Sequence, residues 1–131
     1  MLPVPTLLSL RETHGAENVI ASDVRSPSAD LLENGPFQYL DILDTTQLSR
    51  LVIEENVGTI VHLAAILSAM GEKHPQMALK INNEGTQNVY NVALANKVKV
   101  FCPSTIAVFG PTSPKDNTPI ECIMRTTTMY G

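Results

Sequence analysis

The run from Val98 to Gly110 constrains the fold of this chain more than any other part of its sequence. It opens with apolar and β-branched residues, which is typical of a short buried strand. Pro103 cannot donate a hydrogen bond to a neighbouring strand, so we expect the strand to end before it. Ser104 and Thr105 follow at once. Ligands of open α/β sheets bind beyond the carboxyl ends of the strands, so these two hydroxyl groups indicate a candidate chemical site.

Segments with strand and helix character alternate through the rest of the chain. The expected strands are 18–23, 37–42, 59–65 and the one that begins at 98. The expected helices are 47–56, which residues of N-cap type precede at 44–46, and 76–96, with the end of another at 7–15. Polar stretches at 25–36 and around Gly71 and Pro75 are expected to be loops. This alternation predicts the α/β class, with a doubly wound parallel sheet that helices cover on both faces.

The length, charge and cysteine content of the chain limit the kinds of protein that it can be. Its 131 residues suffice for one domain. The net charge is −4 and the basic residues form no stripe, so we expect no nucleic-acid partner. No apolar run approaches the ~20 residues that cross a bilayer, so we expect no membrane partner. Cys102 and Cys122 lack the spacing of metal ligands, which predicts no metal site and two free thiols in a reducing compartment.

A second residue extends the site predicted at Thr105. Tyr130 follows Thr105 about 25 residues later. A Ser or Thr at a strand end, with a Tyr at about this distance, resembles the catalytic pair of the extended short-chain dehydrogenase/reductase superfamily. The run PSTIAVFGPTSP at 103–114 is similar, more narrowly, to the NAD-dependent L-threonine 3-dehydrogenases of that superfamily. The resemblance covers nearly the whole chain and implies one Rossmann-like, dinucleotide-binding domain at residues 1–131.

The resemblance also implies a reaction and the residues that perform it. L-threonine would be oxidised to 2-amino-3-oxobutanoate with NAD as the hydride acceptor, in the breakdown of threonine to glycine. Thr105 would bond the substrate hydroxyl, Tyr130 would act as the general base, and Ser68 and Ser104 would contact the substrate. Taken without the resemblance, Ser104 and Thr105 can equally cap a loop, and Tyr130 can be an ordinary terminal residue.

Two acidic segments are expected to hold the adenosine end of NAD. Asp23 ends an expected strand, where an acid bonds the ribose hydroxyls and repels a 2′-phosphate, which favours NAD over NADP. A helix cap or a loop acid is the alternative role for this residue. The surrounding SDVR is similar to the family pattern and adds Val24 and Arg25 to the cofactor residues. The motif LDILD also resembles the family, in which Asp41 would contact the adenine edge and Ile42 would pack on the ring.

Small residues and one asparagine complete the expected cofactor site. The motif VHLAA resembles a strand of the superfamily, in which Leu63, Ala64 and Ala65 would let the cofactor approach the sheet. The motif INNEGTQNV resembles a helix of the superfamily, in which Asn82 would bond the backbone and shape the active site. An asparagine inside a helix is otherwise unfavourable. His62 is expected to be a buried core histidine without a catalytic role.

Part of the dinucleotide fold is expected to be missing. Such folds hold the pyrophosphate on a glycine-rich turn after the first strand, and no such turn precedes Leu7. Relatives also carry a lysine four residues after the tyrosine, which favours the phenolate of a group whose ordinary pKa is about 10. The sequence given ends one residue after Tyr130. We therefore expect an incomplete sheet without its first strand, no C-terminal substrate region and no activity.

Other interpretations stay open. The chain could be a non-catalytic interaction fragment that pairs with a full-length homologue, because the strands beside a missing strand would expose unpaired edges. The same edges lead us to expect that the chain alone is unstable or aggregates. It could also be another member of the superfamily, such as a nucleotide-sugar epimerase. The resemblance implies a homodimer and, from animal relatives, a mitochondrial location, although the N-terminus lacks a presequence pattern and a cytoplasmic location stays open.

Overall fold

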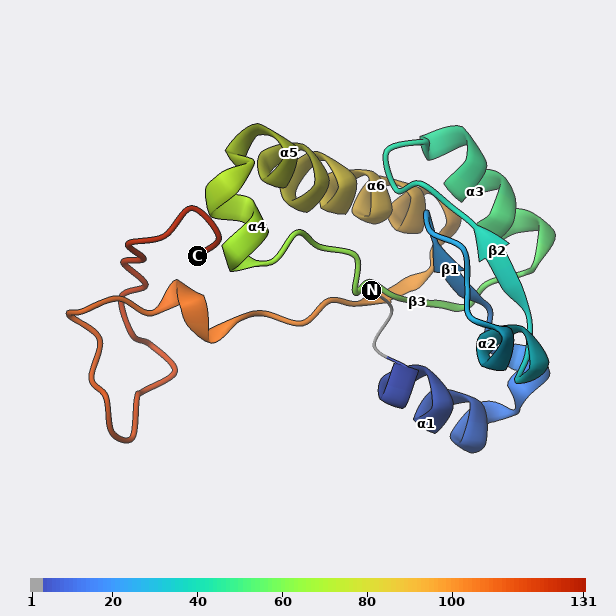
Figure 1. Cartoon of the computed structure of the whole chain (residues 1–131), viewed down its shortest axis with the longest axis horizontal. Helices are drawn as coiled ribbons and strands as arrows, with labels where there is room; N and C mark the ends of the chain where they lie inside the picture. Colours follow the sequence, from blue (N-terminus) through green and yellow to red (C-terminus); the bar gives the residue numbers. More distant parts are fainter. Residues whose placement is uncertain (1–3) are drawn as a thin grey trace.

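The computed structural model describes residues 4–131 and confirms the predicted α/β class (Figure 1). The strands are β1 (Ala21–Asp23), β2 (Phe37–Tyr39), β3 (Thr59–Val61) and β4 (Lys99–Phe101). The α-helices are α1 (Val4–His14), α2 (Ala29–Glu33), α3 (Thr45–Glu54), α4 (Ser68–Lys73), α5 (Pro75–Leu79) and α6 (Thr86–Asn96). Two 3₁₀ turns, at Ala16–Asn18 and Ile106–Val108, and a π-helical segment at Lys80–Gly85 complete the regular structure.

The strands form two separate parallel sheets. β1 pairs with β2, placing Ala21 opposite Phe37, and β3 pairs with β4, placing Thr59 opposite Lys99. Within residues 4–131 no ladder joins the two sheets. Figure 1 shows α3, α5 and α6 on one side of the strands and α1 on the other. The parallel pairing is as predicted, and the division into two halves is what a sheet without one of its central strands would show.

Two hydrophobic cores hold these layers. The larger core is built from α3 and α6, and consists of Leu48, Val52, Val89 and Val92, with Leu40, Ile42, Val57, Ile60, Val98 and Val100 packed against it. The smaller core joins α1 and α2 to the first sheet, and consists of Leu7, Ala21 and Leu31, with Val19 and Phe37 beside it. Leu40 and Ile42 follow β2 and yet pack in the larger core. The two sheets are therefore connected through side chains, although no ladder connects them.

A buried arginine fixes α1 to the first sheet. Arg11 is 5% exposed, and its guanidinium donates hydrogen bonds to the carbonyl oxygens of Val19, Leu31 and Pro36 at 3.4, 3.1 and 2.8 Å. Gly35 lies against the guanidinium with a φ of +139°, and a Cβ at this position would lie 2.8 Å from it. Burial lowers the pKa of Arg11 from its ordinary value. The three carbonyl dipoles therefore stabilise the guanidinium charge, which is buried away from water.

Two short helices form where the sequence predicted loops, which corrects that prediction. α2 lies within 25–36, and its Leu31 is part of the smaller core, so tertiary burial outweighs the polar composition of the segment. α4 contains Gly71, which is buried and would place a Cβ 3.5 Å from Ala78 of α5. Pro75 is the first residue of α5. An N–H at this position would have no acceptor within the helix, so proline costs no hydrogen bond there.

The helix predicted at 76–96 is confirmed in extent, but its interior differs. It continues from α5 through the π-helical segment into α6. The segment contains Asn82, and π-helical turns are frequent at functional sites. Lys97 ends α6 in the left-handed region with a φ of +56°. No helix within the described residues is both long and apolar enough to cross a membrane.

Each of the four strands within residues 4–131 has three residues and is shorter than predicted. The segment predicted from 18 begins pairing only at Ala21, because a 3₁₀ turn occupies Ala16–Asn18. β2 and β3 end before the positions predicted, so Ala64 and Ala65 lie in the loop after β3. β4 ends before Pro103, as predicted.

The predicted helix ends agree closely with the structure. α3 begins after Asp44, whose carboxylate accepts a hydrogen bond from the backbone N–H of Gln47 at 2.9 Å. This contact confirms the predicted N-cap. α1 ends at His14, and Gly15 takes a φ of +89°. The ψ of Gly15 is 135°, so its backbone lies outside the left-handed helical region.

Candidate functional site

Asp23 closes β1 and is held by the residue two positions later. Its Oδ1 accepts a hydrogen bond from the backbone N–H of Arg25 at 3.0 Å, and the guanidinium approaches both carboxylate oxygens at 3.4 Å. Burial by itself raises the pKa of the Asp23 carboxyl, but the hydrogen bonds and charge of Arg25 outweigh it, and the pKa lies below its ordinary value. Val24 between them is exposed. The end of β1 therefore presents an ionised carboxylate.

Asp41 and Ile42 form the turn after β2, and α6 holds this turn. The Oδ1 of Asp41 accepts a hydrogen bond from the N–H of Leu43 at 2.9 Å, and the side chain is otherwise exposed. The carbonyl oxygen of Ile42 accepts a hydrogen bond from Asn88 Nδ2 at 3.1 Å. The Ile42 side chain also lies against Gly85, where a Cβ would collide with it. A larger residue at position 85 would therefore require the Ile42 side chain to move.

Asn82 fixes the loop that follows β3. Its Oδ1 accepts a hydrogen bond from the N–H of Ile66 at 2.7 Å, and its Nδ2 donates one to the carbonyl oxygen of Ile66 at 2.9 Å. Leu63 in this loop is half-buried, whereas Ala64 and Ala65 are exposed. The backbone contact expected of Asn82 is therefore present. Its part in a cofactor site, like that of the three loop residues, stays a prediction.

A cavity of about 240 Å³ lies between the π-helical region and the end of the chain. Its lining residues are Ala78, Leu79, Asn82, Asn83, Met129, Tyr130 and Gly131. The N–H of Met129 donates a hydrogen bond to Glu72 Oε1 at 2.8 Å, which anchors this last segment to α4. Tyr130 is half-buried here. The structure thus brings the predicted general base and the asparagine of the predicted helix motif to one cavity.

The three predicted hydroxyl residues lie in different settings. Thr105 is half-buried, and its Oγ1 accepts a hydrogen bond from the N–H of Ala107 at 3.2 Å, which caps the 3₁₀ turn. Ser104 is exposed before this turn, and Ser68 is exposed at the start of α4. Gly131 lies against the carbonyl oxygen of Ala107, where a Cβ would collide. The end of the chain therefore packs on the turn that Thr105 caps, while neither serine lines the cavity.

His62 directly follows β3 and is a core residue. It is 6% exposed, and its Nε2 lies 2.9 Å from Thr86 Oγ1. Burial lowers the pKa of His62 below its ordinary value. The imidazole is therefore neutral at neutral pH, and the prediction of a buried histidine is confirmed.

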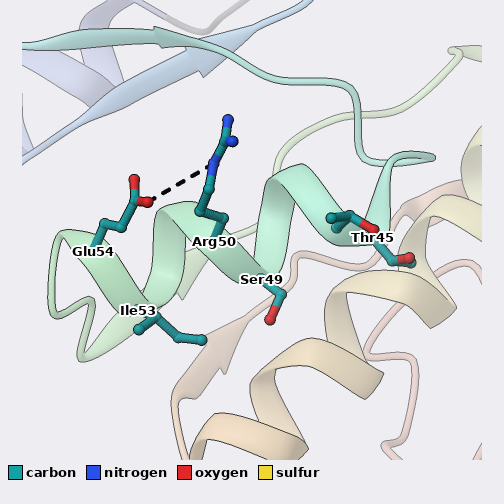
Figure 2. Close-up of a pocket in the computed structure, with 6 residues that line it drawn as sticks. Thr45, Ser49, Arg50, Ile53 and Glu54 are labelled. Atoms are coloured by element: carbon teal, nitrogen blue, oxygen red, sulfur yellow. Dashed lines mark ion pairs between the residues drawn. The ribbon is translucent and has the colours of Figure 1, made fainter.

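A second, more open hollow of about 500 Å³ lies along α3 (Figure 2). Its lining residues are Thr45, Thr46, Ser49, Arg50, Ile53 and Glu54. Arg50 and Glu54 form an ion pair at 3.9 Å, and both side chains are mostly exposed. A single helix supplies the whole lining, and it includes none of the predicted site residues. We therefore place the candidate site at the carboxyl ends of the strands and in the smaller cavity.

The sequence places this site within a known family. The NAD dependent epimerase/dehydratase family matches residues 6–131. The chain belongs to this family. Among its relatives, the mitochondrial L-threonine 3-dehydrogenase of Sus scrofa is 44% identical over 122 residues, which are 93% of this chain and 33% of that protein. A Homo sapiens protein named inactive L-threonine 3-dehydrogenase, mitochondrial, is 42% identical over 122 residues, 93% of this chain and 53% of that protein.

A solved structure extends the match to the fold. The apo form of a monomeric L-threonine 3-dehydrogenase from a metagenome superposes with a TM-score of 0.92 at 38% identity, over 100% of this chain and 42% of that chain. The Rossmann-like dehydrogenase fold predicted from the sequence is thereby confirmed. The chain spans about a third of the length of the pig relative and about half that of the human relative.

Two acids of this family member lie at or just after the ends of strands, where the adenosine end of NAD is expected. The Asp23 carboxylate lies at the end of β1, where it can accept hydrogen bonds from two ribose hydroxyls. Asp41, two residues after the end of the neighbouring β2, is also exposed. No glycine-rich turn follows a strand within the described residues. Binding of the adenosine end by Asp23 and Asp41 therefore stays a prediction, and the pyrophosphate has no cradle of the usual kind in this part of the chain.

Sequence reasoning missed two residues that hold this site together. Asn88 lies in the same motif as Asn82, and a second asparagine inside a helix was a signal that a backbone partner exists. Glu72 had no comparable signal, because its partner Met129 lies 57 residues away and contributes only a backbone N–H.

Proposed function

We propose that this chain carries the adenosine-binding and proton-transfer residues of an L-threonine 3-dehydrogenase site, and that the 131-residue polypeptide alone does not oxidise L-threonine. The observation that carries the proposal is the shared cavity of Asn82 and Tyr130, with the turn capped by Thr105 packed beside it. The relatives named as L-threonine 3-dehydrogenases support the choice of substrate.

In the proposed reaction the chain's own residues handle the substrate hydroxyl. Thr105 would hold the hydroxyl of L-threonine through Oγ1, and Tyr130 would accept its proton at Oη. NAD, when bound, supplies the acceptor for the hydride that leaves the same carbon. Asp23 would bind the adenosine ribose and disfavour a 2′-phosphate, while Arg25 keeps its carboxylate ionised.

Two features of the described residues argue that this site does not turn over by itself. The lining of the cavity beside Tyr130 contains no lysine or other cation that would stabilise its phenolate. A phenol with an ordinary pKa of about 10 is a weak base at neutral pH. No strand within residues 4–131 is followed by a glycine-rich turn for the pyrophosphate. Without a cation beside Tyr130 we expect the proton to stay on the substrate. Without a glycine-rich turn we expect the cofactor to bind weakly.

The experiment combines calorimetry with an activity assay. Purified chain is titrated with NAD, and NADH is followed at 340 nm with L-threonine in excess. We expect no NADH above the blank and weak NAD binding that Asp23→Asn weakens further, while Asp30→Asn, an exposed acid on α2, leaves it unchanged. Turnover above the blank would refute the claim of inactivity. Equal NAD binding by Asp23→Asn and the unaltered chain would refute the assignment of the ribose site.

We further propose a mitochondrial location, because the pig and human relatives carry that word in their names. Fractionation of cells that express the chain tests this directly. Recovery in the cytosolic fraction alone would contradict it.

A further inference from the structure

Residues 126–131, which we call the Tyr130 segment, are joined to another element of the fold by one hydrogen bond. The N–H of Met129 donates to Glu72 Oε1 at 2.8 Å, and the two residues are 57 positions apart. The other hydrogen bonds of the segment within the described residues join its threonine hydroxyls to one another or to its own backbone. Bonds of this internal kind shape the segment but do not attach it to the fold. Among the hydrogen bonds, the one to Glu72 does so.

The helix that carries Glu72 is itself held in place. Gly71, the residue before it in α4, is buried, and a Cβ there would lie 3.5 Å from Ala78 of α5. Just before α4, Asn82 bonds both backbone groups of Ile66. The long helix therefore fixes α4 at its start and along its packed side. Glu72 offers its carboxylate from a fixed support.

The bond between Met129 and Glu72 is of a strong type. A carboxylate that accepts from an N–H makes a shorter and stronger hydrogen bond than a neutral acceptor does. Glu72 takes part in no ion pair within the described residues, so no cation there competes for its oxygens. Figure 1 shows the end of the chain beside α4, as this bond requires.

We propose that Glu72 is a positioning residue, which keeps Tyr130 in the cavity that it shares with Asn82. This inference rests on the proposed function, in which Tyr130 accepts the proton of the substrate hydroxyl. The bond holds the backbone nitrogen of Met129, one residue before Tyr130. A general base acts only within hydrogen-bond reach of the proton that it takes. A segment without this attachment would carry Tyr130 out of that reach.

The same face of α4 also carries Ser68, a residue expected to contact the substrate. Ser68 lies four positions before Glu72, so the two side chains are neighbours on the helix surface. The bond from Met129 to Glu72 therefore sets the Tyr130 segment against the face from which Ser68 would reach L-threonine. One carboxylate thus joins two parts of the proposed site that are far apart in the sequence.

The test follows Tyr130 directly in the full 131-residue chain. The chain contains three tyrosines, so labelling with fluorotyrosine gives three fluorine resonances, and Tyr130→Phe identifies the one of interest. Glu72→Ala should move the Tyr130 resonance to the position that it takes in urea. Hydrogen exchange at the Met129 amide should become about tenfold faster or more. Alanine is the strongest helix former, so α4 should persist in this variant.

Two further variants separate this bond from other effects of the substitution. Glu72→Gln keeps an oxygen that can accept from Met129, so the Tyr130 resonance should stay in place. Exchange at the Met129 amide should then become faster by less than about threefold. Glu12→Ala removes an exposed glutamate from α1 and should change neither readout.

An unmoved Tyr130 resonance in Glu72→Ala would overturn the inference. Equal displacement in Glu72→Ala and Glu72→Gln would also overturn it, because the charge and not the accepted bond would then be responsible. A displacement in Glu12→Ala would do the same, because the effect would not be specific to Glu72. Neither readout uses NAD or L-threonine, so these outcomes leave the activity experiment independent, and turnover there would not alter them.

If Glu72→Ala unfolds, as circular dichroism would show, the unaltered chain decides. The N–H of Thr127 donates no hydrogen bond within the described residues and serves as the reference. Exchange at Met129 that is about tenfold slower or more than at Thr127 supports the inference. Equal exchange at the two amides would overturn it.

Discussion

The burial of His62 makes the stability of the chain depend on pH. Its pKa is lowered by burial, from an ordinary value of 6.5 that the unfolded chain keeps. Below about pH 6.5 the unfolded state therefore binds a proton that the folded state does not. The free energy of unfolding should then fall with decreasing pH, by at most ~1.4 kcal/mol per pH unit for this one group. Above pH 6.5 the contribution is fully present. Urea melts between pH 5 and pH 8 measure this slope.

His62→Gln provides the control for this prediction, because a glutamine amide can still bond Thr86 and does not titrate. The variant should lose most of the slope below pH 6.5. His74→Gln, at an exposed position, should keep it. An unchanged slope in His62→Gln would mean that other groups cause the pH dependence.

Asn82 connects the long helix to the loop after β3 through its two hydrogen bonds with the backbone of Ile66. Asn82→Ala would leave both backbone groups of Ile66 without their partner, at a cost of about 1–3 kcal/mol. Hydrogen exchange at the Ile66 amide should become about tenfold faster or more. Asn83→Ala, one residue further and exposed, should change neither quantity. Equal effects of the two substitutions would show that helix propensity, rather than the bond to Ile66, is responsible.

At the scale of elements, the attachment of α1 depends on Arg11. Arg11→Met keeps the length of the side chain and leaves three carbonyl oxygens without their donor. We expect a loss of about 2 kcal/mol or more in the free energy of unfolding, because unsatisfied buried acceptors are costly. Arg50→Met removes an exposed arginine from α3 and should change stability by less than ~0.5 kcal/mol. Chemical denaturation of the two variants gives the comparison, and similar losses would contradict the assigned role.

The helices and strands also show which features can be predicted from local sequence. The helix at 76–96, the N-cap Asp44 and the strand that ends before Pro103 were predicted, because each is encoded within a few neighbouring residues. α2 and α4 were not, since each forms through a contact with a distant element, Leu31 in the smaller core and Gly71 against α5. The π-helical segment has no propensity pattern that would have revealed it.

At the scale of the whole molecule, some features of the candidate site could be predicted from the sequence and others could not. Asp23, Asn82 and Tyr130 could be selected from motifs, yet no motif shows that Asn82 and Tyr130 share a cavity. Glu72 supports that proximity, because it accepts a hydrogen bond from the backbone N–H of Met129, 57 residues away. Almost any residue can supply a backbone N–H, so the sequence of the partner does not reveal such a contact. The division of the sheet, by contrast, followed from the fold class, since strand order determines which strands are neighbours.

Within residues 4–131 no ladder joins the two sheets, and this division determines how the chain should melt. A domain is stable by only about 5–15 kcal/mol, and each backbone group that is buried without a partner costs ~1–3 kcal/mol. Groups of this kind along β1 and β3, whose residues are mostly half-buried, would remove part of that stability. We expect near-ultraviolet circular dichroism of the chain alone to change over a broad range at low temperature. A sharp, cooperative melt of a monomer would show that the two side-chain cores alone suffice to hold the sheets together.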